Sequence, residues 1–323
     1  MRWTLCAFAA VACAQTFPQP GPAREVAVGA IPGVVAAGAK WEIVWQGSDN
    51  ADGLVGARDG SLFFAQEQFN RVMRLDKRGK VSVYLSDARG PGALALDAEG
   101  RMVAVERTCT DPGRAGECKE PTAVSVLAPK RHVLASSVDG PGGSKSLGRV
   151  NDLVLSRRGD VYFTSGGAFH MNGAGTVVEF GEKLRTNGIM LSRDEKTLYV
   201  TNGAAVVAFD VAADGSVSKQ RDFAKLQGVG DGMAIDAAGR LYVTTPSGVE
   251  VLSPEGKSLG VIPTPRNPIS AAFAGPGKRT LYVVGSGAMI DGKEYTTAAG
   301  VRNNGKTIYK LTMETAGFAG RAK

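Results

Sequence analysis

The sequence predicts an all-β protein, a six-bladed β-propeller with four-stranded blades around a central channel. The first observation is a unit that recurs about every 40 residues between residues 40 and 315. Each unit contains a short apolar strand, a tight turn of the D-x-x-G type and a second strand of the Leu-Tyr-Val kind. The second observation is that these segments alternate, are rich in Val, Tyr and Phe, and lack long helical periodicity. Four strands per unit around an axis form a propeller, and closing the ring removes open sheet edges.

Six copies of the unit are present, and each is marked by the first large residue of its second strand. These residues are Leu62, Met102, Val161, Leu198, Leu241 and Leu281. The longest interval separates the second and third copies, so we expect an insertion within residues 107–148. The early strand 41–45 and the late strand 307–311 are then left to complete one shared blade. A flat β-solenoid is the alternative, but the repeats are too long and too varied for it.

The first 14 residues have the pattern of a secretory signal peptide. Arg2 precedes a short apolar stretch, and Ala12-Cys13-Ala14 forms a small-residue cleavage site before Gln15. This predicts a secreted or periplasmic protein; a lipoprotein anchored at Cys13 is the weaker alternative. Residues 15–39, rich in Pro, Ala and Gly, are expected to form a flexible leader, and residues 316–323 a tail.

Cleavage at this position removes two of the four cysteines. Cys109 and Cys118 remain, within a loop rich in Gly, Pro and Asp. In an oxidising compartment this spacing predicts a disulfide that closes a small loop, and two free thiols are the alternative.

The composition narrows the class of partner. The net charge is +7, but Lys and Arg are scattered and form no basic stripe with interleaved aromatic residues. This pattern argues against a nucleic-acid partner and indicates mainly a solvated surface, with weak support for a small anionic ligand or product. No segment after the signal peptide is apolar enough for us to expect a transmembrane span.

Four polar residues occupy one phase of the repeat. Asp52, Asn151, Asn187 and Asp231 each stand ten or eleven residues before the first large residue of the second strand. Residues at one phase of a closed repeat fold lie at one level of its channel. Two carboxylates and two amide carbonyl oxygens suit a hard divalent cation, and calcium fits best because it accepts neutral oxygens and irregular geometry. The alternative is that Asn and Asp before Gly are ordinary turn residues.

The two remaining positions of this phase are Gly92, which offers space or a close backbone approach, and a position near Ser270. A histidine-rich zinc site is excluded because the chain has only two histidines.

The segments around these residues resemble one protein family. R-V-N-D at 149–152, T-N-G-I-M-L-S-R-D-E-K-T-L-Y-V at 186–200 and D-G-M-A-I-D-A-A-G-R-L-Y-V at 231–243 are similar to the gluconolactonase/regucalcin family of six-bladed propellers. The resemblance implies a hydrolase that opens lactones with a divalent metal in the central channel. It also implies metal ligation by Asn187 and Asp231, with Asn151 near metal and substrate.

The same resemblance implies that Arg149 contacts substrate and that an acidic residue of an E-G-P-x-W motif completes the metal site. Here that motif is replaced by Asp52-Gly53-Leu54-Val55-Gly56. Asp52 keeps the charge but is one methylene shorter, so we expect the metal to lie off-centre, to be bound more weakly, or to be bridged to Asp52 by a water.

The mechanism implied is attack of water on a lactone carbonyl, with Asp231 as base. Arg149 then holds the product carboxylate or a ring hydroxyl, or is a salt-bridged residue of the rim. Glu106 and His170 are each expected either at the channel mouth or on the surface. Two alternative functions stay open: an organophosphate or phosphoester hydrolase on the same kind of propeller, and a noncatalytic binding propeller with a structural calcium.

Overall fold

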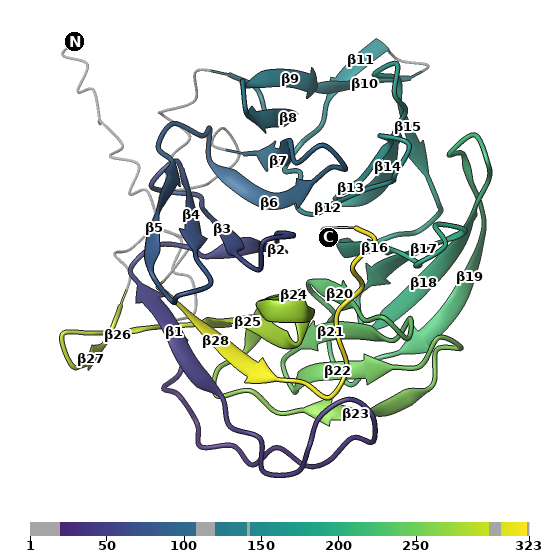
Figure 1. Cartoon of the computed structure of the whole chain (residues 1–323). Coiled ribbons are helices and arrows are strands. Elements are labelled where there is room, and N and C mark those ends of the chain that lie inside the picture. The colour runs from purple at the N-terminus through teal and green to yellow at the C-terminus, as the bar shows by residue number, and fades with distance from the viewer. Residues whose placement is uncertain (1–19, 108–119, 141–142, 297–304, 322) are drawn as a thin grey trace, which may run out of the picture.

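The six-bladed propeller is confirmed by a computed structural model, which describes residues 20–107, 120–140, 143–296, 305–321 and 323. Six four-stranded antiparallel sheets surround one axis, and the first strand of each sheet faces the centre (Figure 1). In the described residues, helical structure is confined to the 3-10 turn η3 (Pro276–Lys278).

Five blades are each built from consecutive strands, ordered from the channel outwards. Blade 1 contains β2 (Asp52–Gly56), β3 (Leu62–Gln66), β4 (Arg71–Leu75) and β5 (Val81–Leu85). Blade 2 contains β6 (Pro91–Leu96), β7 (Met102–Glu106), β8 (Ala123–Ala128) and β9 (His132–Ala135). Blade 3 contains β12 (Leu153–Leu155), β13 (Val161–Ser165), β14 (Gly167–Met171) and β15 (Val177–Phe180). Blade 4 contains β16 (Thr186–Leu191), β17 (Thr197–Asn202), β18 (Ala205–Val211) and β19 (Val217–Lys225). Blade 5 contains β20 (Met233–Ile235), β21 (Leu241–Thr245), β22 (Gly248–Leu252) and β23 (Ser258–Ile262).

Blade 6 closes the ring by combining strands from both ends of the chain. Its order from the channel outwards is β24 (Pro268–Ala274), β25 (Thr280–Ser286), β28 (Lys306–Thr312) and β1 (Glu42–Gly47). The purple β1 and the yellow β28 lie side by side in Figure 1, and their antiparallel register runs from Glu42 opposite Lys310 to Gly47 opposite Lys306. The expectation that the early and late strands share a blade is confirmed.

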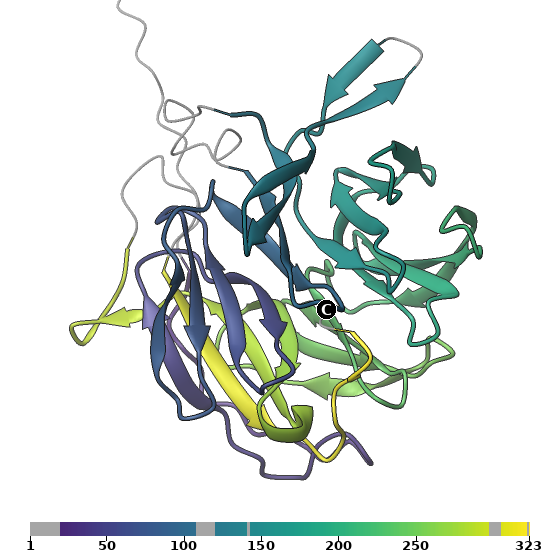
Figure 2. The ribbon, with the colours of Figure 1, turned by 45° about the horizontal axis from the view of Figure 1, so that its top comes forward.

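Two short hairpins interrupt the repeat. β10 (Ser137–Gly140) pairs with β11 (Gly143–Ser146) in the interval between blades 2 and 3, where the sequence predicts an insertion. This hairpin extends away from the ring in the tilted view of Figure 2. The second, β26 (Met289–Ile290) with β27 (Lys293–Glu294), lies between β25 and β28.

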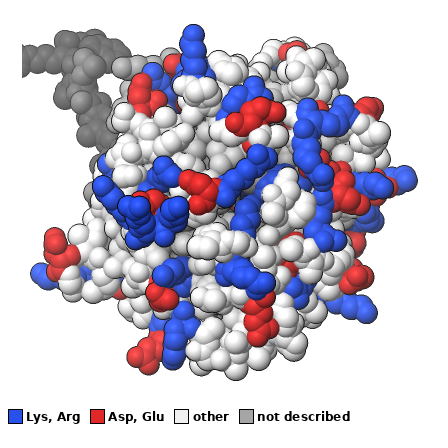
Figure 3. All heavy atoms as spheres, in the orientation of Figure 1, with Lys and Arg blue, Asp and Glu red and all other residues white. Residues whose placement is uncertain are grey.

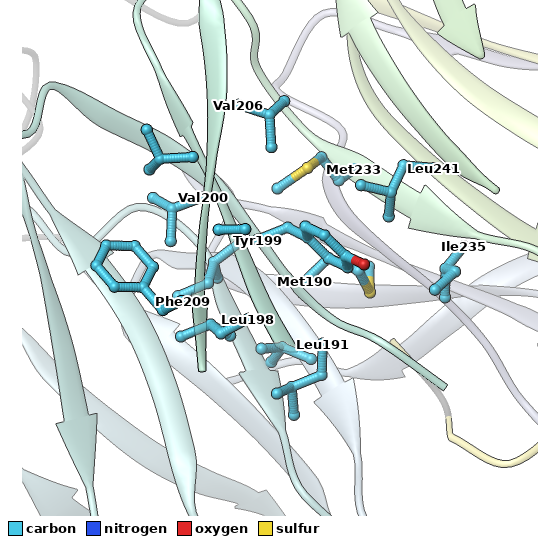
Figure 4. Close-up of a cluster of buried hydrophobic side chains, with 14 of the residues drawn as sticks. Met190, Leu191, Leu198, Tyr199, Val200, Val206, Phe209, Met233, Ile235 and Leu241 are labelled. Atoms are coloured by element: carbon cyan, nitrogen blue, oxygen red, sulfur yellow. The ribbon is translucent and has the colours of Figure 1, made fainter. Parts of the chain in front are cut away.

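The core lies between neighbouring blades rather than at the axis. Figure 4 shows one such layer, in which Met190 and Leu198 of blade 4 meet Met233 and Leu241 of blade 5. All four side chains are at most 1% exposed. Burial of apolar faces between adjacent sheets fixes the rotation of each blade, and this sets the height of the channel-facing residues.

The described part of the leader differs from the expectation of flexibility. Val28, Val34 and Val35 are buried in a cluster with side chains of blades 5 and 6. Trp41 Nε1 donates to the carbonyl oxygen of Pro263 at 2.8 Å. From Val28 onwards this segment therefore covers the outer side of the ring, because its valines bury apolar area that the blade pattern does not use.

The C-terminal tail also packs against the propeller. Ala237 donates its N–H to Ala316 O at 2.8 Å, and Phe318 donates its N–H to Ile235 O at 3.1 Å. The chain end then lies at the centre of the ring in Figures 1 and 2.

The proposed signal peptide and the Cys109–Cys118 pair lie outside the described residues. In the described part of the chain, no helix is long and apolar enough to cross a membrane. On the face shown in Figure 3, basic and acidic side chains are interspersed.

Candidate functional site

The inner strands bring the residues of the shared phase to one level of the channel. A Cβ added to Gly53 would lie 2.2 Å from Gly92 O, and one added to Gly188 would lie 2.2 Å from Asp231 O. Gly232 donates its N–H to Ile269 O at 3.0 Å. The backbones of neighbouring blades are therefore in contact at this level, as a closed ring of first strands requires.

An arginine that the repeat phase does not contain lies among these residues. Arg107 directly follows β7, and its side chain is 3% exposed. Its Nη2 is 3.3 Å from Asp52 Oδ2, and its Nη1 donates to Asn151 Oδ1 at 3.1 Å. A Cβ on Gly92 would lie 2.6 Å from Arg107 Cζ, so the space that Gly92 leaves open is filled by the guanidinium.

The amides of Asn151 and Asn187 form the next contact of the ring. Asn151 Nδ2 donates to Asn187 Oδ1 at 2.6 Å, while Thr201 Oγ1 accepts the N–H of Asn187 at 3.2 Å. Together with Arg107 these contacts form a continuous polar chain from Asp52 to Asn187. An amide oxygen has two lone pairs, so Asn187 Oδ1 keeps acceptor capacity toward the channel.

Glu67, which is fully buried just after β3, joins two arginines. Arg107 Nη2 lies 2.8 Å from Glu67 Oε2, and Arg149 Nη2 donates to Glu67 Oε1 at 3.1 Å. Arg149 is thus held beside the ring by a salt bridge and stays partly exposed. Of the two roles that the sequence left open for Arg149, the salt bridge is present in the structure.

Asp231 completes the ring next to Asn187. Its backbone N–H donates to Thr244 O at 2.8 Å, which fixes the start of the inner strand. Burial raises the pKa of Asp231 well above its usual range, and the negative charges of Asp52 and Asp152 add to that rise. The positive charges of Arg107 and Lys323 act in the opposite direction. The residue is intermediate in exposure, because part of it still borders the channel.

A lysine and a further carboxylate complete the charge cluster. Lys306, at the start of β28, is 6% exposed, and burial lowers its pKa to about 8 although Asp52, Asp49 and Glu67 favour its charged form. Burial also raises the pKa of Asp49 to about 6, against hydrogen bonds donated by three backbone N–H groups. Lys306 therefore belongs to the same charge cluster as Asp52, Asp49 and Glu67.

The opposite end of the channel is closed by the tail. Lys323 Nζ donates to Asp152 Oδ1, and Asp152 Oδ2 accepts the N–H of Ile189 at 3.1 Å. A cavity of about 30 Å³ lies beside the tail and is lined in part by Met233 and Lys323.

Two further expectations from the sequence are wrong. Glu106 lies neither at the channel mouth nor on the surface: it is 2% exposed and is bound by Arg131 Nη2 at 2.8 Å. His170 lies in β14, where its ring stacks on Tyr162 with centroids 4.8 Å apart. Other groups engage both side chains: Glu106 Oε1 also accepts the N–H of Arg89, and His170 Nε2 lies 3.4 Å from Asp160 Oδ1.

A family model described as SMP-30/Gluconolactonase/LRE-like region matches residues 50–287. The chain belongs to this family. The match covers all six inner strands, which confirms the resemblance inferred from the motifs.

Curated relatives agree with the family match. A gluconolactonase of Zymomonas mobilis subsp. mobilis is 29% identical over 197 residues, which are 50% of this chain and 54% of the relative. The chain thus spans about half the length of that relative. A regucalcin of Xenopus laevis is 28% identical over 275 residues, covering 79% of this chain and 87% of the relative.

Solved structures share the fold. A gluconolactonase from Xanthomonas campestris superposes with a TM-score of 0.70 at 21% identity, covering 93% of this chain and 99% of the other. A calcium-binding regucalcin from Agrobacterium tumefaciens gives a TM-score of 0.61 at 15% identity, covering 87% and 96%. At these identities the likeness establishes the propeller alone.

The donor set of this family member fits a hard cation on one side of the ring. In the described residues, His, Cys, Asp and Glu form no group of three able to hold a metal. Asn187 Oδ1 and the Asp231 carboxylate are oxygen donors of the kind that calcium accepts. Asp52 and Asn151 are instead engaged by the Arg107 guanidinium.

Proposed function

We propose that the protein is a divalent-metal-dependent lactonase whose catalytic site is the ring of channel residues. The observation that supports this most is the placement of Asn151, Asn187 and Asp231 together at one level of the channel in a member of the gluconolactonase-like family. These are the residues that the family resemblance assigns to metal and substrate. Calcium is the proposed cation, because half of the donors are neutral oxygens.

The proposed reaction adds water across the lactone ester bond. When bound, a divalent cation supplies an electrophile that stabilises the developing oxyanion. The Asp231 carboxylate removes a proton from the attacking water while the water oxygen forms a bond to the carbonyl carbon. The ring C–O bond then breaks, and the leaving oxygen takes up the proton, which gives a hydroxy acid.

The surroundings of Asp231 suit this role. A carboxylate that is poorly solvated holds a proton more tightly, which makes it a stronger base than an exposed aspartate once it is ionised. Arg149, partly exposed at the rim, is proposed to bind the carboxylate of the product. The tail closes the opposite end, so substrate and product use the same mouth.

We expect the purified protein to hydrolyse at least one aldonolactone, with activity lost on chelation and restored by calcium. The acid released is measured with a pH indicator over a small panel of lactones, before and after chelator treatment. A phosphotriester and a phosphomonoester in the same panel test the alternative hydrolase. The proposed function would be overturned if no lactone in the panel showed metal-dependent turnover.

The proposed location of the enzyme is outside the cytoplasm. We expect signal cleavage to leave a mature chain that begins at Gln15, with Cys109 and Cys118 joined. N-terminal sequencing of the exported protein tests the first point. Intact mass after alkylation, with and without prior reduction, tests the second, and alkylation of both cysteines without reduction would contradict the disulfide.

A further inference from the structure

We propose that Arg107 is a built-in cation of the ring, which pairs with Asp52 and Asn151 and competes with the divalent metal for them. The metal is then bound by Asn187 and Asp231, while Asp52 is not a direct ligand. This inference rests on the proposed function in one respect, that a divalent cation binds in the channel.

The contacts of the guanidinium carry the first step. Its two terminal nitrogens reach Asp52 Oδ2 at 3.3 Å and Asn151 Oδ1 at 3.1 Å, so it lies between two of the four ring residues. A metal coordinated by both of these oxygens would have to occupy the same space. Two cations at such a distance also repel each other strongly in a poorly solvated site.

The second step is that Arg107 is held in this position. Glu67 is fully buried and pairs with Arg107 Nη2 at 2.8 Å. If the guanidinium moved away, Glu67 would keep its salt bridge with Arg149 but lose the one with Arg107. The charge of Arg107 would then face buried parts of the protein without this partner. Breaking a buried ion pair is strongly destabilising, so displacement of Arg107 by a metal is opposed.

Two features of the sequence, Gly92 and Asp52, fit the position of the Arg107 guanidinium. Gly92 leaves the room that the guanidinium fills, since a Cβ there would lie 2.6 Å from Cζ. The short side chain of Asp52 places Oδ2 at hydrogen-bonding distance, 3.3 Å, from the guanidinium. The positive charge that offsets Asp52 is therefore supplied by a side chain of the protein, Arg107.

Asn151 has a corresponding change of role. Because its Oδ1 accepts from Arg107, its Nδ2 is directed to Asn187 Oδ1 at 2.6 Å. Asn151 thereby orients the oxygen of Asn187 and acts as a positioning residue rather than as a ligand.

Calorimetric titration of the chelator-treated protein with Ca²⁺, and separately with Mn²⁺, tests the proposal. We expect Arg107→Met to bind metal at least about tenfold more tightly than the wild type, because a competing charge is removed. We expect Asp52→Asn to change the affinity of the wild type by less than about twofold, and to reverse most of the gain in the Arg107→Met background. The control Arg101→Met removes an exposed positive charge at the far end of the same blade and should have no effect.

The opposite results overturn the proposal. They are a loss of about tenfold or more in metal affinity on Asp52→Asn alone, or no gain on Arg107→Met. If Arg107→Met does not fold, as judged by circular dichroism and urea unfolding, the double variant Arg107→Met/Glu67→Gln replaces the buried pair by neutral groups of similar size. Its affinity is compared with that of Glu67→Gln, so that the two proteins differ only at residue 107, and the same tenfold gain is required.

Heats of binding separate this inference from the proposed function. If lactones are not hydrolysed but Arg107→Met binds metal more tightly, the inference holds and the proposed function fails. If lactones are hydrolysed but the affinity is unchanged, the reverse is true. If neither the wild type nor any variant binds metal, the inference is overturned.

Discussion

Replacing Asp231 with alanine is expected to reduce kcat for lactone hydrolysis by about 10³-fold or more, because both the base and a metal ligand are lost. The fold should persist, since the backbone N–H of Asp231 still donates to Thr244 O. Asp231→Asn keeps the shape and one oxygen but cannot take up the proton, so it should lose activity to a similar extent. As a control, Asp160→Asn changes a carboxylate that is also buried but lies in blade 3, away from the ring, and should keep activity. Activity retained by Asp231→Ala would show that the base is another group.

The raised pKa of Asp231 gives this substitution a second, pH-dependent effect. A carboxyl whose pKa is higher in the folded state adds stability at low pH, and this contribution is lost as the pH rises through the folded-state pKa. In the presence of chelator, the free energy of unfolding of Asp231→Asn should therefore rise relative to that of the wild type as the pH is raised from 4 to 8. Urea unfolding at several pH values measures the difference. A constant difference would mean that the carboxyl is not penalised by burial.

The blades were predictable because one local pattern repeats six times. Each copy has a turn at a similar place between its first two strands, so the period can be followed through the insertion between the second and third copies. The shared blade followed from the two strands left over at the ends. The leader and the tail do not repeat, so no period predicts their packing: Val28 and Val34 lie in a segment rich in Pro, Ala and Gly, the composition of a linker.

The ring was predictable in part. The phase of the first strand identified Asp52, Asn151, Asn187 and Asp231, because period fixes height in a closed repeat. A second phase of the repeat also carries charge, because Glu67 and Arg107 each stand five residues after the first large residue of their second strands. They are the two charged residues at that phase, and such a comparison would have found them.

Other contacts of the site could not be predicted from spacing. Lys306 opens a third strand of the shared blade, and no period relates it to Asp52 or Glu67. Lys323 reaches Asp152 by way of a tail that has no counterpart in the other blades. A repeat phase specifies which side chains share a level, but the charge balance at that level depends on every strand that ends there.

The largest expected effect on stability lies at Asp236, in the tight turn of blade 5. This aspartate is fully buried; its Oδ1 accepts N–H groups of Ala238 and Arg240, and its Oδ2 accepts Arg240 Nε at 2.6 Å and the hydroxyl of Tyr242 at 3.0 Å. We expect Asp236→Ala to lower the free energy of unfolding by about 3 kcal/mol, because a buried hydroxyl and a guanidinium lose their acceptor. Urea unfolding measures the change.

Asp76 is a control for this substitution, since it is the first residue of a turn of the same D-x-x-G type, between β4 and β5 of blade 1. Its Oδ1 accepts the N–H groups of Arg78 and Lys80 at 2.8 and 2.9 Å, but its carboxylate is open to water. Asp76→Ala removes the turn hydrogen bonds alone and should have a much smaller effect. Equal losses in the two variants would mean that the turn bonds, which the repeat pattern predicts, account for the stability. A larger loss at Asp236 would show that its contacts with Arg240 and Tyr242 account for the difference. Blade 5 adds these contacts to a turn motif that several blades share.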